Sequence, residues 1–149
     1  MANPLVPQGT LNRLLNSITF VSNPGLNITA SYLVKEQTTM NFDGVATTPI
    51  DTATGYVPSP EPYQRITLAC HLVKSMALVQ AWKNQIEFST LIGNFVVWPD
   101  VPPGIGLQPY QISSGVISTV NPIRMDGTSA DWALMLHGLY YINSSIWNT

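Results

Sequence analysis

The sequence predicts a mainly β protein, built from two packed antiparallel sheets as a sandwich or partly closed barrel. One flanking α-helix is expected at about 75–87, and a long β-excursion at about 35–58. Two observations predict this fold. Apolar and polar residues alternate along several short segments separated by turn residues, and the apolar spacing changes to three and four residues in one place. The 149 residues suffice for a single domain over 1–149 with its own core.

The first third of the chain predicts an arm followed by two strands. Residues 1–14 hold two prolines and offer too few local contacts to fold alone, so we expect an N-terminal arm that docks on a neighbouring subunit. A first strand is expected at 16–22. Residues 26–34 then alternate, which is typical of one half-buried strand. Its inward side is expected to carry Leu26, Ile28, Ala30, Tyr32 and Val34.

Residues 35–60 are the least regular part of the chain. They are rich in Thr, Gly, Pro and Asp, with strand-like pieces at 38–42 and 54–57. A segment this long without regular structure is unusual inside a compact domain and is often functional. We therefore expect a β-excursion whose tip projects from the body.

The middle of the chain predicts a buried strand that leads into the helix. Residues 63–72 alternate, with Ile66, Leu68, Cys70 and Leu72 on the inward side. The spacing then becomes helical through Met76, Val79, Trp82 and Ile86. Ser75 is expected to be the N-cap, because its hydroxyl can accept a hydrogen bond from a free backbone N–H of the first turn.

Three more strands are expected in the last third, at 94–98, 111–122 and 130–142. Residues 99–109 hold four prolines and two glycines, which predicts a loop between the first two. Trp132, Leu134 and Leu136 fall on one face of the last strand and are expected in the core, as is Trp82 on the helix.

Charge is scarce in this chain. Six Lys or Arg and eight Asp or Glu make up 9% of the residues, the net charge is −2, and the mean hydropathy is +0.14. A soluble domain usually carries about 25% charged residues, so we expect much of this surface to be covered by other protein. The scattered cations argue against non-specific nucleic-acid binding, which depends on clustered Lys and Arg.

The residues predict no catalytic, metal or cofactor site. His71 and His137 are the two histidines, and no motif places a nucleophile or ligand set beside them. The lone Cys70 is expected to fill the core. Residues 1–9 lack the basic start and apolar run of a signal peptide, so we expect synthesis in the cytoplasm without membrane insertion.

Four segments carry a resemblance to a known family. They are residues 3–14 (NPLVPQGTLNRL), 59–63 (SPEPY), 90–93 (TLIG) and 138–145 (GLYYINSS). These segments resemble the tail tube proteins of contractile-tailed bacteriophages. The expected order of elements along the whole chain is also similar to the wider tube family, which includes pyocin tubes and the type VI secretion tube.

The resemblance implies a structural virion protein without enzymatic activity. Six copies would form a ring whose inner strands join into one β-barrel, and rings would stack into the inner tail tube through which DNA is ejected. The implied partners are further copies, the tail sheath protein, and baseplate or tail terminator proteins. The implied location is the virion tail, assembled in the bacterial cytoplasm. A baseplate or tail-completion ring protein, or a monomeric β-sandwich that binds carbohydrate or another ligand through exposed tryptophans, remains an alternative.

The resemblance also implies where subunits meet. Its stacking loop and lumen strands match residues 35–56, so the residues expected at ring stacking or the lumen are Lys35, Glu36, Asp43, Asp51 and Tyr56. A neutral or mildly acidic wall would avoid holding DNA, and Glu61 is a further candidate for it. The residues expected at other subunit contacts are Leu5 and Leu11, which lie in the docking arm, and Trp98 and Trp147, which lie next to a loop or the tail, since aromatic residues are enriched at interfaces.

Overall fold

The fold is mainly β and antiparallel, as the sequence predicts. The computed structural model describes residues 11–102, 104 and 106–147. Seven strands form one sheet in the order β2-β1-β7-β8-β9-β6-β3, and β4 and β5 form a separate two-stranded sheet. The strands are β1 (Ser17–Phe20), β2 (Ile28–Thr29), β3 (Leu33–Asp43), β4 (Thr47–Thr52), β5 (Gly55–Pro60), β6 (Tyr63–Val73), β7 (Leu91–Trp98), β8 (Tyr110–Val120) and β9 (Asp131–Tyr141). The helices are α1 (Ala77–Phe88) and the short α2 (Ser144–Trp147).

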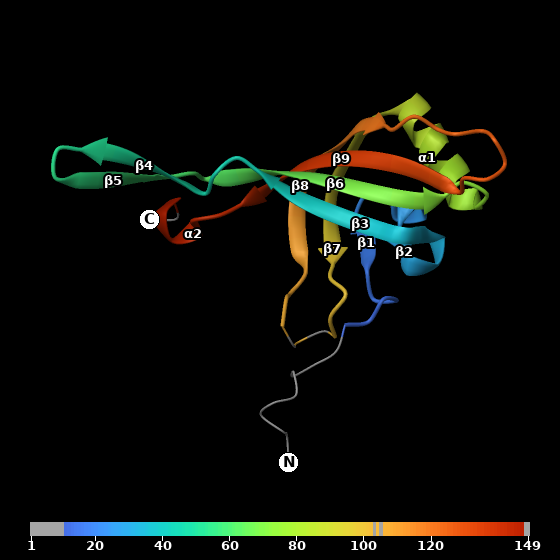
Figure 1. Cartoon of the computed structure of the whole chain (residues 1–149), viewed down its shortest axis with the longest axis horizontal. Coiled ribbons are helices and arrows are strands. Elements are labelled where there is room, and N and C mark those ends of the chain that lie inside the picture. The colour runs from blue at the N-terminus through green and yellow to red at the C-terminus, as the bar shows by residue number, and fades with distance from the viewer. Residues whose placement is uncertain (1–10, 103, 105, 148–149) are drawn as a thin grey trace, which may run out of the picture.

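The large sheet curls until its two halves face one another. Figure 1 shows β3, β6 and β9 running across the view, while β1, β7 and β8 run down it. Alternating side chains from both halves meet in one buried cluster that includes Phe20, Phe95 and Ile112 from one half and Leu68 and Leu134 from the other. The result is a nearly closed antiparallel barrel, whose end strands β2 and β3 are not paired with each other.

Strand β6 forms the predicted inward row. Ile66, Leu68, Cys70 and Leu72 are each fully buried, and β6 pairs with β9 along its whole length. The strands predicted at 94–98, 111–122 and 130–142 correspond to β7, β8 and β9, and the described residues of 99–109 are loop. The period-two pattern was sufficient here because these strands bury mainly one face, although β9 also buries Ala133 between Trp132 and Leu134.

Helix α1 covers one end of the barrel (Figure 1). Trp82 is fully buried and its ring packs edge-on against Phe20, with 5.1 Å between the ring centroids. The predicted helix at 75–87 is confirmed, but the predicted N-cap Ser75 is wrong. A turn closed by the hydrogen bond from Met76 N–H to Val73 O places Ser75 before the helix, so Met76 is the N-cap residue.

The single strand expected over 26–34 is also wrong. Two 3₁₀ turns, Pro24–Leu26 and Ala30–Tyr32, leave only β2 between them. A 3₁₀ turn has three residues per turn, so it breaks the two-residue alternation of a strand. As a result Leu33, rather than Val34, is the buried residue where β3 begins.

Candidate functional site

The most exposed part of the molecule is the hairpin formed by β4 and β5, which projects far from the barrel (Figure 1). Its two strands pair from Thr47↔Pro60 to Thr52↔Gly55, around a two-residue turn. Every residue of β4 is exposed, as are all residues of β5 except Pro60. An isolated two-stranded hairpin is only marginally stable in water. This one therefore lacks the packing that usually holds such an element in place.

Prolines set the hydrogen-bond pattern of this hairpin. Pro49 and Pro58 lie opposite each other, and neither carries an N–H, so they occupy a non-hydrogen-bonded pair. Because the two kinds of pair alternate, Thr47↔Pro60 and Asp51↔Tyr56 are non-hydrogen-bonded pairs as well. The backbone groups of these six residues point to the two outer edges. Pro49 thus removes one outward donor from β4, and Pro58 and Pro60 remove two from β5.

The same pairing gives the hairpin two faces of different chemistry. Residues directly opposite each other share a face. One face carries Thr48, Ile50, Val57 and Ser59. The other, which we call the proline face, carries Thr47, Pro49, Asp51, Tyr56, Pro58 and Pro60.

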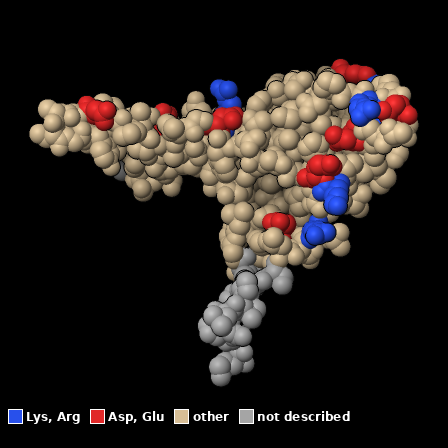
Figure 2. Space-filling view, viewed as in Figure 1, with Lys and Arg blue, Asp and Glu red and all other residues tan. Residues whose placement is uncertain are grey.

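The hairpin is almost free of charge. Among residues 44–60, Asp51 is the single Asp, Glu, Lys or Arg. Figure 2 shows the charged side chains gathered mainly over the barrel, with the projecting part largely uncharged. Tyr56 is 66% exposed. A surface of this kind suits contact with another protein better than contact with water alone.

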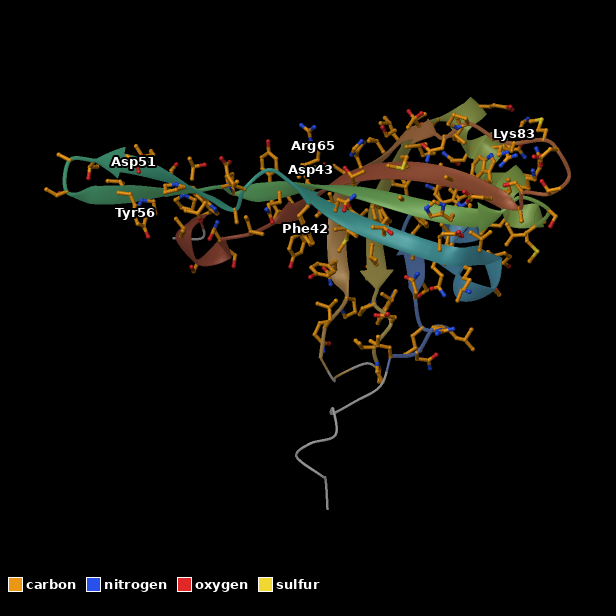
Figure 3. All side chains as sticks on the ribbon, in the orientation of Figure 1. Phe42, Asp43, Asp51, Tyr56, Arg65 and Lys83 are labelled. Atoms are coloured by element: carbon orange, nitrogen blue, oxygen red, sulfur yellow. The ribbon has the colours of Figure 1, made fainter. Side chains whose placement is uncertain are left out.

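The base of the hairpin joins the barrel through a polar and an aromatic group. The backbones of Asp43 and Arg65 lie opposite each other where β3 pairs with β6. Both residues lie at this junction beside Phe42 (Figure 3). Phe42 packs edge-on against Tyr110 and Tyr140, with ring centroids 5.6 and 6.1 Å away. These three rings connect β3, β8 and β9, so the stem of the projection is anchored in the barrel.

A cavity of about 580 Å³ opens on the barrel beside β3. Its lining combines apolar and aromatic side chains, among them Trp98, Leu107 and Tyr110, with the charged side chains Arg13, Lys35, Glu36 and Asp100. This size lies in the range of about 300–1,000 Å³ that is usual for binding pockets.

A bulge in β3 shapes this cavity. The register between β3 and β6 shifts between Leu33 and Thr38, and Gln37 adopts a positive φ of 54° there. The Gln37 side chain donates to the backbone oxygen of Arg13 (3.2 Å) and accepts from Asn16 Nδ2 (3.3 Å). The bulge thereby ties β3 to the segment before β1, across the gap in the barrel.

The structure divides the five residues predicted for ring stacking or the lumen. Asp51 and Tyr56 form a cross-strand pair on the hairpin, and Asp43 lies at its base. Lys35 and Glu36 lie instead in the cavity, at the other end of β3. Glu61 follows β5, and its N–H donates to Ala46 O (2.9 Å). The sequence alone could not separate these groups, because residues 35–56 run from the barrel strand β3 into the separate hairpin of β4 and β5.

The residues predicted for other subunit contacts lie at the surface where they are described. Leu11 is exposed, Trp98 is 38% exposed at the end of β7, and Trp147 is 49% exposed in α2. Leu5 lies outside the described residues. Trp98 is the one that also lines the cavity.

Each of the two histidines takes part in a polar side-chain contact between strands. His71 Nδ1 lies 3.1 Å from Asp131 Oδ1. Thr67 Oγ1 donates to Asp43 Oδ2 (2.6 Å) and lies 3.2 Å from His137 Nδ1. A hydroxyl has one hydrogen, and here Asp43 accepts it, so His137 is not placed as a base that activates Thr67. Sequence reasoning missed this network, since its members come from three strands.

The cysteine thiol is a buried core group rather than a reactive one. Burial raises the pKa of the Cys70 thiol from 9.0 to about 12, which keeps it protonated and unreactive at neutral pH. Within residues 11–102, 104 and 106–147, no group of three or more His, Cys, Asp or Glu is arranged to hold a metal ion. Among the same residues no helix is long and apolar enough to cross a membrane.

Comparison with known proteins gives no assignment. No protein-family model matches the chain, and no curated protein matches it.

Proposed function

We propose that this chain is a structural virion protein whose hexameric rings stack into the inner tail tube of a contractile phage tail. Such a tube would be the conduit for DNA ejection and would contact the sheath along its outside. The proposal rests on the resemblance of residues 3–14, 59–63, 90–93 and 138–145 to tail tube proteins, together with the surface described above. It assigns the chain no enzymatic step.

The observation that carries the proposal is the exposed hairpin of β4 and β5. It is uncharged except for Asp51 and projects from the barrel without a packing partner among the described residues. A free monomer gains little from such an element, whereas a subunit in a stack can bury it. Obligate interfaces commonly bury about 2,000–5,000 Å² and are more apolar than ordinary surface.

The edge of β3 supports side-by-side assembly. This 11-residue strand stands at one end of the seven-stranded sheet, with β6 as its paired neighbour, and it contains no proline. A long unpaired edge is a template for another strand. Pairing it with a neighbouring copy would extend the sheet around a ring and remove the edge. Head-to-tail contacts of this kind close when the rotation allows it.

Negative-stain electron microscopy of the purified protein at increasing concentration tests the proposal. Long hollow filaments are the expected result. Single rings that do not stack would favour a baseplate or tail-completion protein. Isolated small particles at all concentrations would favour the other alternative, a monomeric ligand-binding sandwich, for which the cavity beside Trp98 and Tyr110 would be the site.

A further inference from the structure

The outer edges of the hairpin are poorly suited to strand addition. The outward donors of β5 should come from residues 56, 58 and 60, and two of these are proline. On β4, Pro49 removes the middle one of the three outward donors, which come from residues 47, 49 and 51. Proline at outward-facing positions is a device that protects exposed strand edges from pairing. A partner of the hairpin must therefore contact its side chains rather than extend its sheet.

The proline face has a distinct recognition chemistry. It carries three proline rings, the Tyr56 ring and one carboxylate, Asp51. Proline rings are rigid, so little entropy is lost when they pack against an aromatic surface. Among the described residues Asp51 forms no ion pair, so its charge is available to a partner.

The cavity beside β3 offers the complementary chemistry. Trp98 and Tyr110 supply aromatic walls, and Arg13 and Lys35 supply positive charge. Neither cation forms an ion pair among the described residues. The cavity also contains Glu36 and Asp100, so its charged side chains sum to zero, and an incoming carboxylate must pair with Arg13 or Lys35 individually.

The proline face and the cavity of one chain cannot meet. Thr38, at the end of the bulge, lies five positions before Asp43 on β3, which at about 3.3 Å per residue is already roughly 16 Å, and Lys35 lies beyond the bulge. The hairpin then continues away from the barrel (Figures 1 and 3). A contact between the two surfaces therefore requires two molecules.

We infer that the proline face of one copy docks in the cavity of a second copy, with Asp51 facing Lys35 and Arg13. The inference rests on the proposed function, because it names the partner surface for the hairpin. The two surfaces differ, so each copy uses both and the contact propagates from copy to copy. It is a contact through side chains rather than through strand pairing.

A charge swap tests the inference on the full chain. Asp51→Lys places like charges together, and Lys35→Glu does the same from the other side. We expect each variant to need about tenfold or more protein for half-maximal assembly, since like charges across an interface are strongly unfavourable. The double variant carrying both changes, or an equimolar mixture of the two single variants, should assemble close to the wild-type concentration. Sedimentation velocity measures the assembled fraction.

Matched controls come from α1, which Figure 3 shows at the end of the molecule opposite the hairpin. Glu87→Lys and Lys83→Glu make the same charge changes in an exposed ion pair and should leave assembly unchanged. Circular dichroism should show all variants folded, because Asp51 and Lys35 are both exposed. Wild-type-like assembly of Asp51→Lys, or no recovery in the double variant, would overturn the inference.

A cross-link gives a second and independent readout. In a chain carrying Asp51→Cys and Lys35→Cys, mild oxidation should produce a ladder of disulfide-linked oligomers, while the buried Cys70 stays unreactive. Absence of the ladder from assembled protein would also overturn the inference. Both tests can be scored on any oligomer. Failure of the wild-type chain to build hollow tubes would therefore contradict the proposed function without deciding this contact.

Discussion

Pro49 and Pro58 face each other across the hairpin of β4 and β5, in a pair that neither residue can close with a backbone hydrogen bond. This pair determines which backbone groups of the hairpin point outward, and with Pro60 it removes half of the six outward donors. The hairpin is thus exposed along its whole length but protected at its edges. Exposure of this kind suits a surface that must meet one partner and avoid others.

Restoring the backbone N–H groups that the prolines lack should make the protein aggregate through the edge of the hairpin. In the double variant Pro58→Thr with Pro60→Thr, β5 regains two outward N–H groups and becomes a template for strand pairing. We expect thioflavin T fluorescence and turbidity to rise at concentrations where the wild-type chain shows neither. Pro122→Thr, in an exposed stretch outside the strands, is the control and should behave as wild type. Equal behaviour of the double variant and the control would show that the prolines do not protect the edge.

Truncating the central aromatic residue of α1 should strongly destabilise the fold. Trp82 is fully buried against Phe20, and Trp82→Ala should lower the free energy of unfolding by about 3–5 kcal/mol through lost burial and a cavity. Phe88, on the same helix, is 88% exposed, so Phe88→Ala should change stability by no more than about 0.5 kcal/mol. Urea denaturation measures both. Similar losses for the two variants would mean that α1 does not cover the core as described.

A glycine in β8 should not tolerate a side chain. A Cβ on Gly115 would lie 2.5 Å from the backbone oxygen of Gly93 and 2.6 Å from the Phe95 ring. Gly115→Ala should therefore cost about 1–3 kcal/mol of stability, or force β7 and β8 apart. Gly25→Ala, where nothing lies within 4 Å, is the matched control. A thermal midpoint for Gly115→Ala equal to that of the control would contradict the close approach of the two strands.

The buried thiol should report on unfolding. Cys70 has its pKa raised from 9.0 to about 12 by burial, so it should react with a maleimide at neutral pH only when the barrel opens. Because the folded-state pKa is the higher one, the thiol favours the folded state fully below pH 9 and progressively less between pH 9 and about 12. Rapid labelling in native buffer, at the rate of the urea-unfolded chain, would place Cys70 at the surface instead.

Much of the fold follows from local pattern, and the failures have physical causes. The alternation on β6 and β9 and the helical spacing on α1 could be recognised because each element buries mainly one face. The single strand predicted at 26–34 was wrong because the residues of two 3₁₀ turns alternate between apolar and polar as a strand does. The N-cap was misplaced by one residue because a turn ending at Met76 precedes the helix.

The candidate site was only partly predictable. The projection of residues 35–58 was expected from composition, and its outer part does project. Its first part is instead the barrel strand β3, which is placed there by pairing with β6. The cavity brings together Arg13, Lys35 and Trp98 from distant parts of the chain. Nothing in their spacing indicates this meeting, which results from the curl of the sheet.

The central claim is that copies of this chain cover one another's surfaces. Sedimentation velocity of the wild-type protein over a hundredfold range of concentration tests it most directly. The account predicts that the 16.3 kDa chain gives way to a hexamer and then to large, polydisperse particles as concentration rises. A single monomeric species throughout the range would contradict it.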